Sequence, residues 1–159
     1  MTAQSRKDKE IQVTVNKKAW HDFELDEKFQ AGLVLLGSEV KSLRDGQADL
    51  TGSYARIEDN QCWLVGAGIA PYKQAAAAAH EPNRKRKLLL HKTEIRKIKT
   101  KLQQRGFTLV PLRIYFNQNG LAKIDLALAS GKRQYDKRRT IDERHQKRLL
   151  DRNMKKYHK

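Results

Sequence analysis

Two alternating segments on either side of Asn119-Gly120 constrain the fold of this chain more than any other feature of its sequence. The inward-facing set is Leu112, Ile114 and Phe116 on the first segment and Ala122, Ile124, Leu126 and Leu128 on the second. The opposite set is Arg113, Tyr115, Lys123 and Asp125. A period of two is typical of strands with one buried face, and Asn-Gly is the preferred pair of a type I′ turn. The two segments and the turn between them predict an antiparallel hairpin over residues 107–129.

Other segments predict shorter elements. Strands are expected at residues 11–15, 21–25 and 31–36, and a second hairpin is expected around Asp59-Asn60. Helices are expected at 38–46, begun by Ser38 and ended by Gly46, and at 91–106, with Ile95, Ile98 and Leu102 on one stripe. Residues 71–82 are expected to form a long crossover loop.

These elements favour an α+β fold of mostly antiparallel β structure. We expect an OB-like closed barrel of about six strands with two to three flanking helices and a basic C-terminal tail. The predicted boundaries are a flexible N-terminus at 1–10, an OB-like barrel at 11–130 and the tail at 131–159 of the 159 residues.

Sequence motifs for catalysis, nucleotide binding and metal binding are missing. There is no G-x-x-x-x-G-K-[ST], G-x-G-x-x-G, C-x-x-C or H-E-x-x-H, and the five histidines are scattered. Cys62 lies within a predicted strand and is expected to be a buried structural thiol. We therefore predict no enzyme activity, catalytic residue, metal or cofactor. The sequence has no run of eighteen apolar residues and no secretory signal, which predicts a cytoplasmic protein.

The positive charge predicts a polyanionic partner, nucleic acid first and anionic membrane second. The net charge is +16 and the calculated pI is about 10.1. Bases concentrate at Lys17-Lys18, at residues 84–87 and from Lys132 onward, where there are twelve Lys or Arg against four Asp or Glu. Lys17, Arg84 and Arg86 are therefore predicted to contact RNA.

The tail encodes a helix that has little to pack against. Residues 140–143 spell T-I-D-E, which matches the capping box S/T-x-x-E. Past Ile141 the apolar residues are Leu149, Leu150, Met154 and Tyr157, too few to dock on a core. We predict a tail that is disordered when free and helical when a polyanion neutralises it.

Several segments, in this order, resemble the SsrA-binding protein (small protein B) family of bacterial trans-translation. They are AGLVLLGSEVKSLRDG at 31–46, Ser53-Tyr54, RKRKLLLHKTEI at 84–95, GFTLVPLRIYF at 106–116 and GKRQYDKRRTI at 131–141. The resemblance implies an OB-type barrel that binds the tRNA-like domain of transfer-messenger RNA. It implies a monomer that delivers this RNA, with elongation factor Tu, to stalled ribosomes. The tail would become helical in the empty mRNA channel, downstream of the decoding centre. There it would bind the ribosome through residues that include Lys132, Arg133, Arg144, Lys147 and Arg148.

The resemblance also assigns residues. Gln30, Leu89 and Lys123 match positions that grip the tRNA-like domain, and Gln30 stands where the family commonly has glutamate. Tyr135, Asp136, Lys137 and Arg138 match the motif at the root of the tail. Tyr135 would stack on an rRNA base, and Lys137 and Arg138 would contact phosphates. Asp136 would either orient its neighbours or accept a hydrogen bond from a base edge.

Two further classes of protein fit the composition. A structural or accessory ribosomal RNA-binding protein is equally basic and tailed, and only the ordered motifs favour the adaptor over it. A nucleic-acid enzyme is opposed only by the missing motifs. A membrane-surface role fits least well, because the apolar face of the tail is too thin to insert.

Overall fold

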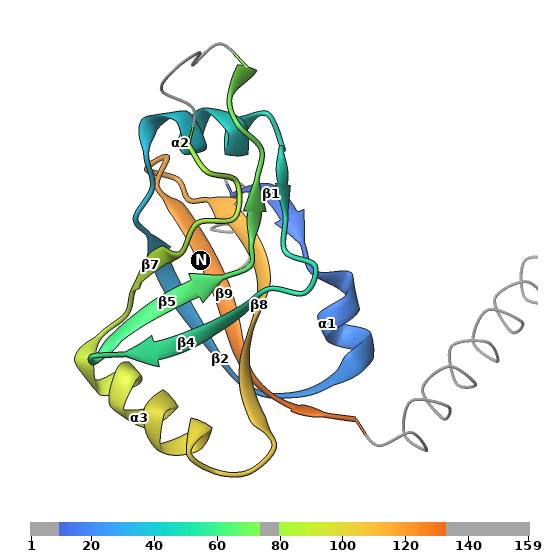
Figure 1. Cartoon of the computed structure of the whole chain (residues 1–159), viewed down its shortest axis with the longest axis vertical. Helices are drawn as coiled ribbons and strands as arrows, with labels where there is room; N and C mark the ends of the chain where they lie inside the picture. Colours follow the sequence, from blue (N-terminus) through green and yellow to red (C-terminus); the bar gives the residue numbers. More distant parts are fainter. Residues whose placement is uncertain (1–9, 74–79, 133–159) are drawn as a thin grey trace, which may run out of the picture.

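A closed ring of antiparallel strands forms the centre of the molecule in the computed structural model, which describes residues 10–73 and 80–132 (Figure 1). The ring runs β8-β4-β5-β7-β2-β9 and closes where β9 pairs with β8. Its strands are β2 (Phe23–Leu33), β4 (Tyr54–Glu58), β5 (Gln61–Val65), β7 (Arg86–Leu89), β8 (Phe107–Phe116) and β9 (Ala122–Gly131). This arrangement confirms the predicted α+β barrel.

Smaller elements cover the ring. β1 (Ile11–Val15) pairs with the second half of β8, and β3 (Ala48–Asp49) pairs with β6 (Gly68–Ile69). The helices are α1 (Lys17–Asp22), α2 (Gly37–Arg44) and α3 (Lys92–Leu102). In Figure 1, α2 lies at one end of the barrel, α3 at the other and α1 at the side. No described helix has the length and apolar character needed to span a bilayer.

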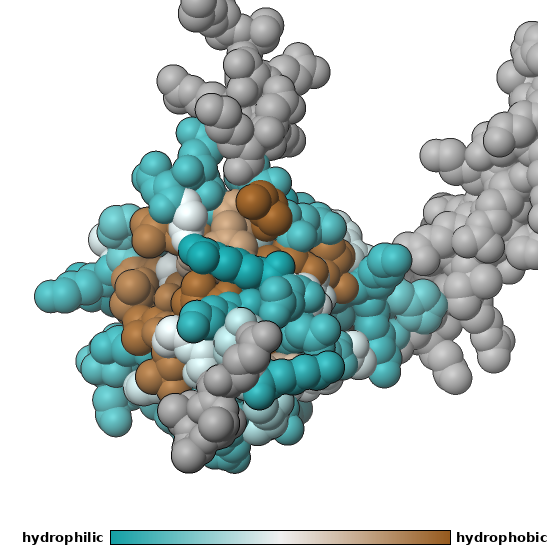
Figure 2. All heavy atoms as spheres, turned by 90° about the horizontal axis from the view of Figure 1, so that it is seen from above, coloured by the Kyte–Doolittle hydropathy of each residue, from teal (hydrophilic) through white to brown (hydrophobic). Residues whose placement is uncertain are grey.

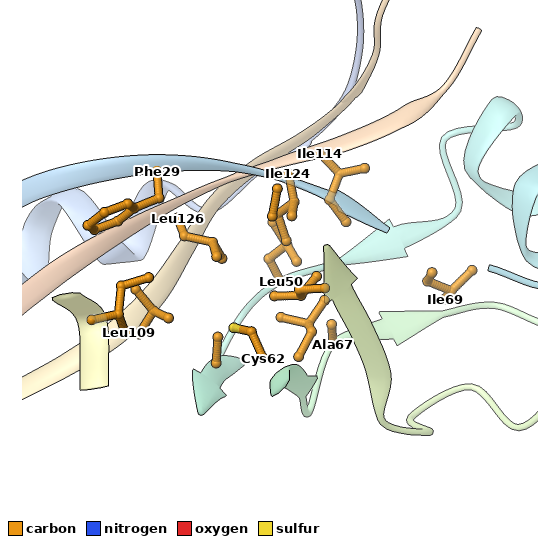
Figure 3. Packing of buried hydrophobic residues seen from close by; sticks show 14 of the residues in the cluster. Phe29, Leu50, Cys62, Ala67, Ile69, Leu109, Ile114, Ile124 and Leu126 are labelled. Carbon is orange, nitrogen blue, oxygen red and sulfur yellow. The ribbon is translucent and has the colours of Figure 1, made fainter. Parts of the chain in front are cut away.

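Apolar side chains from all the ring strands fill the barrel (Figure 3). Ile114, Ile124 and Leu126 are fully buried there, as the alternation predicts. Leu112 differs from the prediction, because a register shift between Pro111 and Arg113 turns it to the other side of the sheet. It packs with Ala19 of α1 in a second apolar cluster.

Helix α1 replaces part of the strand expected at 21–25. Asn16 begins it: its Oδ1 accepts from the Ala19 amide at 3.1 Å, and its Nδ2 donates to the carbonyls of Leu50 and Pro111 at 3.3 and 3.0 Å. A single buried amide therefore starts the helix and ties it to the barrel. The side-chain pattern of six residues was too short to reveal this helix.

The cap predicted for the next helix is also different. The Glu39 carboxylate accepts from the Leu36 amide at 2.7 Å, whereas the Ser38 hydroxyl lies 3.0 Å from Nδ1 of His80. The buried strand predicted at 31–36 ends at Leu33, and Val34 and Leu36 are exposed.

The surface at the α2 end of the molecule is mixed in character. Viewed from this end, apolar patches lie between polar side chains (Figure 2).

The two hairpin turns differ in type. Asp59 and Asn60 both have positive φ, +48° and +56°, as a type I′ turn requires. At the second turn only Gly120 is left-handed, at +71°, and Asn117 Oδ1 accepts from the amides of Asn119 and Leu121. The Asn119-Gly120 prediction of a type I′ turn is therefore wrong, although the hairpin is confirmed.

Some predictions fall outside the described residues. Of the predicted flexible N-terminus at 1–10, only Glu10 is described, and the alanine-rich part of the crossover loop lies at 74–79. The predicted tail helix and its contacts lie at 133–159. These remain predictions.

Candidate nucleic-acid interface

Gly32, on β2, lies at the centre of a surface where three predicted RNA-contacting residues meet. It pairs with Leu89 of β7 on one side and with Lys123 of β9 on the other. Gln30 precedes it by two residues and so points to the same outer face. Strand pairing therefore brings Gln30, Leu89 and Lys123 together from three separate parts of the sequence. We call these residues and Gly32 the Gly32 surface.

Leu89 supplies the apolar part of the Gly32 surface. It is 54% exposed, whereas its neighbour Leu88 is 2% exposed and packs in the barrel. A Cβ at Gly32 would lie 3.4 Å from the Cβ of Leu89, so the missing side chain lets Leu89 lie close over β2. An apolar triple usually marks a core, but strand alternation places the middle leucine outside.

Gln30 is exposed and held in position by the barrel. Its Nε2 donates to the hydroxyl oxygen of Tyr115, which is fully buried and pairs with Lys123 across the strands. Burial, followed by the charge of Asp125, raises the pKa of Tyr115 above its usual value, so the phenol stays neutral. The Gln30 amide therefore has a fixed partner on the strand that adjoins Lys123.

The cationic side chains near this surface differ in how free they are to bind a phosphate. Arg113 Nε donates to Asp125 at 2.6 Å, a second nitrogen lies 3.2 Å from Glu10, and its guanidinium lies 4.3 Å from the Tyr115 ring centre. Lys123, in contrast, forms no ion pair within the described part of the chain. Its ammonium group can therefore bind phosphate without first losing a carboxylate partner.

The prediction that Arg86 contacts RNA is wrong. Arg86 is 0% exposed, and its guanidinium donates to Glu39 at 2.8 Å and to the carbonyls of Ala67 and Pro82 at 2.6 and 2.8 Å. Arg84 is partly exposed and also pairs with Glu39. Arg86 serves the core because β7 alternates, so that it points inward with Leu88.

Glu39 balances these two guanidinium groups inside the molecule. Burial alone would raise the pKa of its carboxyl group, but hydrogen bonds from Arg84 and the Leu36 amide and the charge of Arg86 outweigh burial. The net result is a pKa below the usual value. An ionised Glu39 thus ties the start of α2 to β7, the strand that presents Leu89.

The alternation of side chains along β7 places one further cation, Lys87, on the outer face of the barrel. Lys87 lies between Arg86 and Leu88, so its side chain is on the outer face with Leu89. Strand alternation along β7 separates the bases into an inner and an outer set, a division that charge alone does not reveal.

The described residues offer little for catalysis or metal binding. No group of three or more His, Cys, Asp or Glu side chains comes together in residues 10–73 and 80–132. Cys62 is buried, as predicted, and burial raises its pKa to about 12. The thiol therefore stays protonated, which is typical of a structural cysteine.

Comparison with known proteins shows the family to which this chain belongs. The family model for SmpB protein matches residues 13–156. The chain belongs to the SmpB family. The SsrA-binding protein of Sulfurihydrogenibium sp. is 52% identical over 143 residues, which cover 90% of this chain and 93% of that protein. The SsrA-binding protein of Thermus thermophilus is 54% identical over 127 residues, 80% of this chain and 88% of that protein.

A solved structure described as "tmRNA-SmpB: a journey to the center of the bacterial ribosome" has the same fold. It matches with a TM-score of 0.66 and 50% identity, covering 80% of this chain and 93% of that chain. The resemblance noted in the sequence is thereby confirmed at the level of family and fold.

Two predicted residues of this SmpB-family chain lie away from the Gly32 surface. Lys17 is exposed at the start of α1, and Figure 1 shows α1 and β7 on opposite sides of the barrel. Lys132 donates through its amide to Asp22 and through Nζ to Trp20, both at 3.2 Å to carbonyl oxygens. The root of the C-terminal segment is therefore fixed to α1.

Proposed function

We propose that this chain is an RNA-binding adaptor of trans-translation. It binds the tRNA-like domain of transfer-messenger RNA and brings this RNA, with elongation factor Tu, to stalled ribosomes in the cytoplasm. The observation that carries the proposal is the meeting of Gln30, Leu89 and Lys123 around Gly32. The relatives named SsrA-binding protein and the solved tmRNA-SmpB structure support it.

Each residue of the Gly32 surface suits a different part of an RNA chain. Leu89 packs against a base or ribose, Lys123 binds a phosphate, and Gln30 hydrogen-bonds a hydroxyl or an exocyclic amino group. A glutamate at position 30 would accept a stronger, charge-assisted bond than the amide does. None of these roles requires a reacting group, so the function is binding rather than catalysis.

The C-terminal segment acts on the ribosome in this proposal. From Lys132, held on α1, it enters the mRNA channel only when no message fills it. Tyr135 stacks on rRNA, Lys137 and Arg138 contact phosphates with Lys132 and Arg133, and Arg144, Lys147 and Arg148 continue along the channel. Asp136 orients these neighbours or accepts from a base edge. In one monomer, the barrel thus binds the tRNA-like domain, and the C-terminal segment binds the mRNA channel only when the channel is empty.

RNA preference tests the proposal directly. We would compare tRNA-like-domain RNA, elongator tRNA and plain duplex RNA at near-physiological salt, using the full chain and a form that ends at Lys132. This end point keeps the hydrogen bonds of Lys132 to Trp20 and Asp22. We expect both forms to prefer the tRNA-like domain. Equal binding of all three RNAs, abolished by the truncation, would favour a structural or accessory ribosomal protein.

A matched pair of leucine and isoleucine variants tests the surface itself. Leu89→Ser removes an exposed apolar contact from the Gly32 surface, whereas Ile11→Ser removes one that is 69% exposed on β1. We expect Leu89→Ser to weaken binding to the tRNA-like domain about tenfold and Ile11→Ser to change it less than about twofold. Thermal unfolding of both variants checks that the barrel is intact.

A further inference from the structure

The outer face of β4, β5 and β7 carries a tryptophan between two cations. Trp63 of β5 pairs with Arg56 of β4 on one side and with Lys87 of β7 on the other. Cys62 and Leu64, which flank Trp63, are fully buried in the barrel, so Trp63 points outward. Paired residues share a face, and Arg56, Trp63 and Lys87 therefore form one row across three strands. We call this the Trp63 row.

The Trp63 row adjoins the Gly32 surface. Lys87 and Leu89 are two residues apart on β7 and point to the same side, a separation of about 7 Å along a strand. β7 pairs with β5 on one side and β2 on the other, so no strand lies between the two sets of residues. An RNA strand lying on Leu89 would therefore reach Lys87 within about one nucleotide.

The charge of this face suits a polyanion. Arg56 pairs with Glu58 at 2.5 Å and Lys85 lies 3.6 Å from the same carboxylate, but Lys87 forms no ion pair with any residue in the described ranges. Past the tip of the β4–β5 hairpin, Lys92 and Arg96 of α3 line a hollow with Asn60 and Ile95. Glu58 therefore pairs with Arg56 and Lys85, which leaves Lys87 without a carboxylate partner in the described ranges, and Lys92 and Arg96 lie near the edge of this face.

We propose that the Trp63 row is a second contact site for the same RNA, on which one unpaired base stacks against the Trp63 indole. Lys87 and Arg56 then bind the phosphates on either side of that base. An aromatic platform between cations is how single-stranded nucleic acid is held on barrel faces. The inference rests on the proposed function and extends its RNA surface from β2 and β9 to β5 and β4.

Tryptophan emission reports the stacking separately from affinity. The chain has two tryptophans, Trp20 on α1 and Trp63, so Trp20→Phe leaves Trp63 as the only reporter. The matched protein, Trp63→Phe, reports Trp20, which is 43% exposed beside Lys28 on another side of the barrel. On saturation with tRNA-like-domain RNA, followed independently by anisotropy of labelled RNA, we expect Trp63 emission to fall by about half or more. Trp20 emission should change much less.

Affinity measurements give a second readout. Trp63→Ala should weaken binding to tRNA-like-domain RNA about 5- to 150-fold, the effect of losing one base stack, whereas Trp63→Phe should retain most of the affinity. Lys87→Gln leaves the indole in place and needs no repacking of the core. It should weaken binding and reduce the salt dependence by about one phosphate contact. Circular dichroism melting separates these effects from loss of fold.

The outcomes distinguish this site from the proposed function. If the RNA saturates the protein with Trp63 emission unchanged and Lys87→Gln binds like the parent, the Trp63 row is not a contact site, and the adaptor function stands. Quenching of Trp63 by ribosomes but not by the RNA would assign the face to the ribosome and also overturn the inference. Loss of any preference for the tRNA-like domain would instead overturn the proposed function.

Discussion

Glu39 connects the start of α2 to β7 through its ion pairs with Arg84 and Arg86. Its carboxylate is fully buried and balances Arg86, which is buried as well. Glu39→Gln would leave the Arg86 charge in the core without its counter-ion, which typically costs about 3–5 kcal/mol. We expect urea unfolding at pH 7 to show a loss of that order.

The control for this prediction is a carboxylate in a similar pairing at the surface. Glu58→Gln removes the partner of Arg56 and Lys85, but its side chain is 38% exposed. We expect a change of less than about 1 kcal/mol in the free energy of unfolding. If the two variants lost equal stability, burial of the Glu39 pair would not be the cause.

Acid should weaken the same pair. The pKa of Glu39 is lower in the folded chain than its usual value of 4.5, so the unfolded chain binds more protons between these two pKa values. Its contribution to stability is therefore complete above about pH 4.5 and is lost as pH falls through the folded pKa. The difference in unfolding free energy between the parent and Glu39→Gln should shrink from about pH 6 to about pH 3.5. A difference that stayed constant would contradict the lowered pKa.

At the residue scale, the sequence shows which residues are charged or apolar but not which of their side chains point into the barrel. The sequence shows that residues 84–87 are all basic, yet charge alone does not tell which side chains face the barrel. Arg86 points inward because β7 alternates and because Glu39, distant in sequence, supplies its counter-ion. The resemblance placed Leu89 correctly on the outside, where hydropathy alone favoured the core.

At the scale of elements, the β4–β5 hairpin depends on its two-residue turn. Asp59 and Asn60 both adopt positive φ, which costs any residue with a Cβ some energy. Asn60→Gly should keep or raise stability by up to about 1 kcal/mol, although it removes the 3.3 Å hydrogen bond from Lys99. Asn60→Val should lower it by about 1–2 kcal/mol, since β-branched residues tolerate this region poorly. Thermal melts of the pair would contradict the turn assignment if valine were the more stable.

Elements with a long periodic pattern were predictable, and elements defined by distant partners were not. The hairpin of β8 and β9 and helix α3 follow their own alternation or stripe. Helix α1 is only six residues long, and the bonds from Asn16 to Leu50 and Pro111 that fix it on the barrel are not encoded by any local pattern. β7 is four residues long and resembles a charge run, so it becomes a strand only through pairing with β2 and β5.

At the scale of the whole molecule, positive charge is divided between a folded surface and a C-terminal segment. Residues 133–159 hold eleven Lys or Arg against four Asp or Glu, a net charge of +7 in 27 residues, whereas residues 1–132 hold 23 against 14, a net charge of +9 in 132 residues. Binding that depends on many phosphate contacts weakens steeply with salt. The slope of the logarithm of the binding constant against the logarithm of the salt concentration becomes more negative by about 0.7–0.9 for each contact. The segment should therefore dominate affinity for any RNA, and the barrel should dominate selectivity.

This division predicts that removing the segment affects duplex binding more than binding to the tRNA-like domain. Ending the chain at Lys132 should flatten the salt dependence of duplex binding by several units of slope and reduce duplex affinity strongly at low salt. The ratio of affinities for tRNA-like-domain RNA and duplex should rise, because contacts to bases and shape are less sensitive to salt than contacts to phosphate. Fluorescence anisotropy over a range of potassium chloride concentrations measures both quantities. A ratio that fell on truncation would mean that the segment, and not the barrel, selects the RNA.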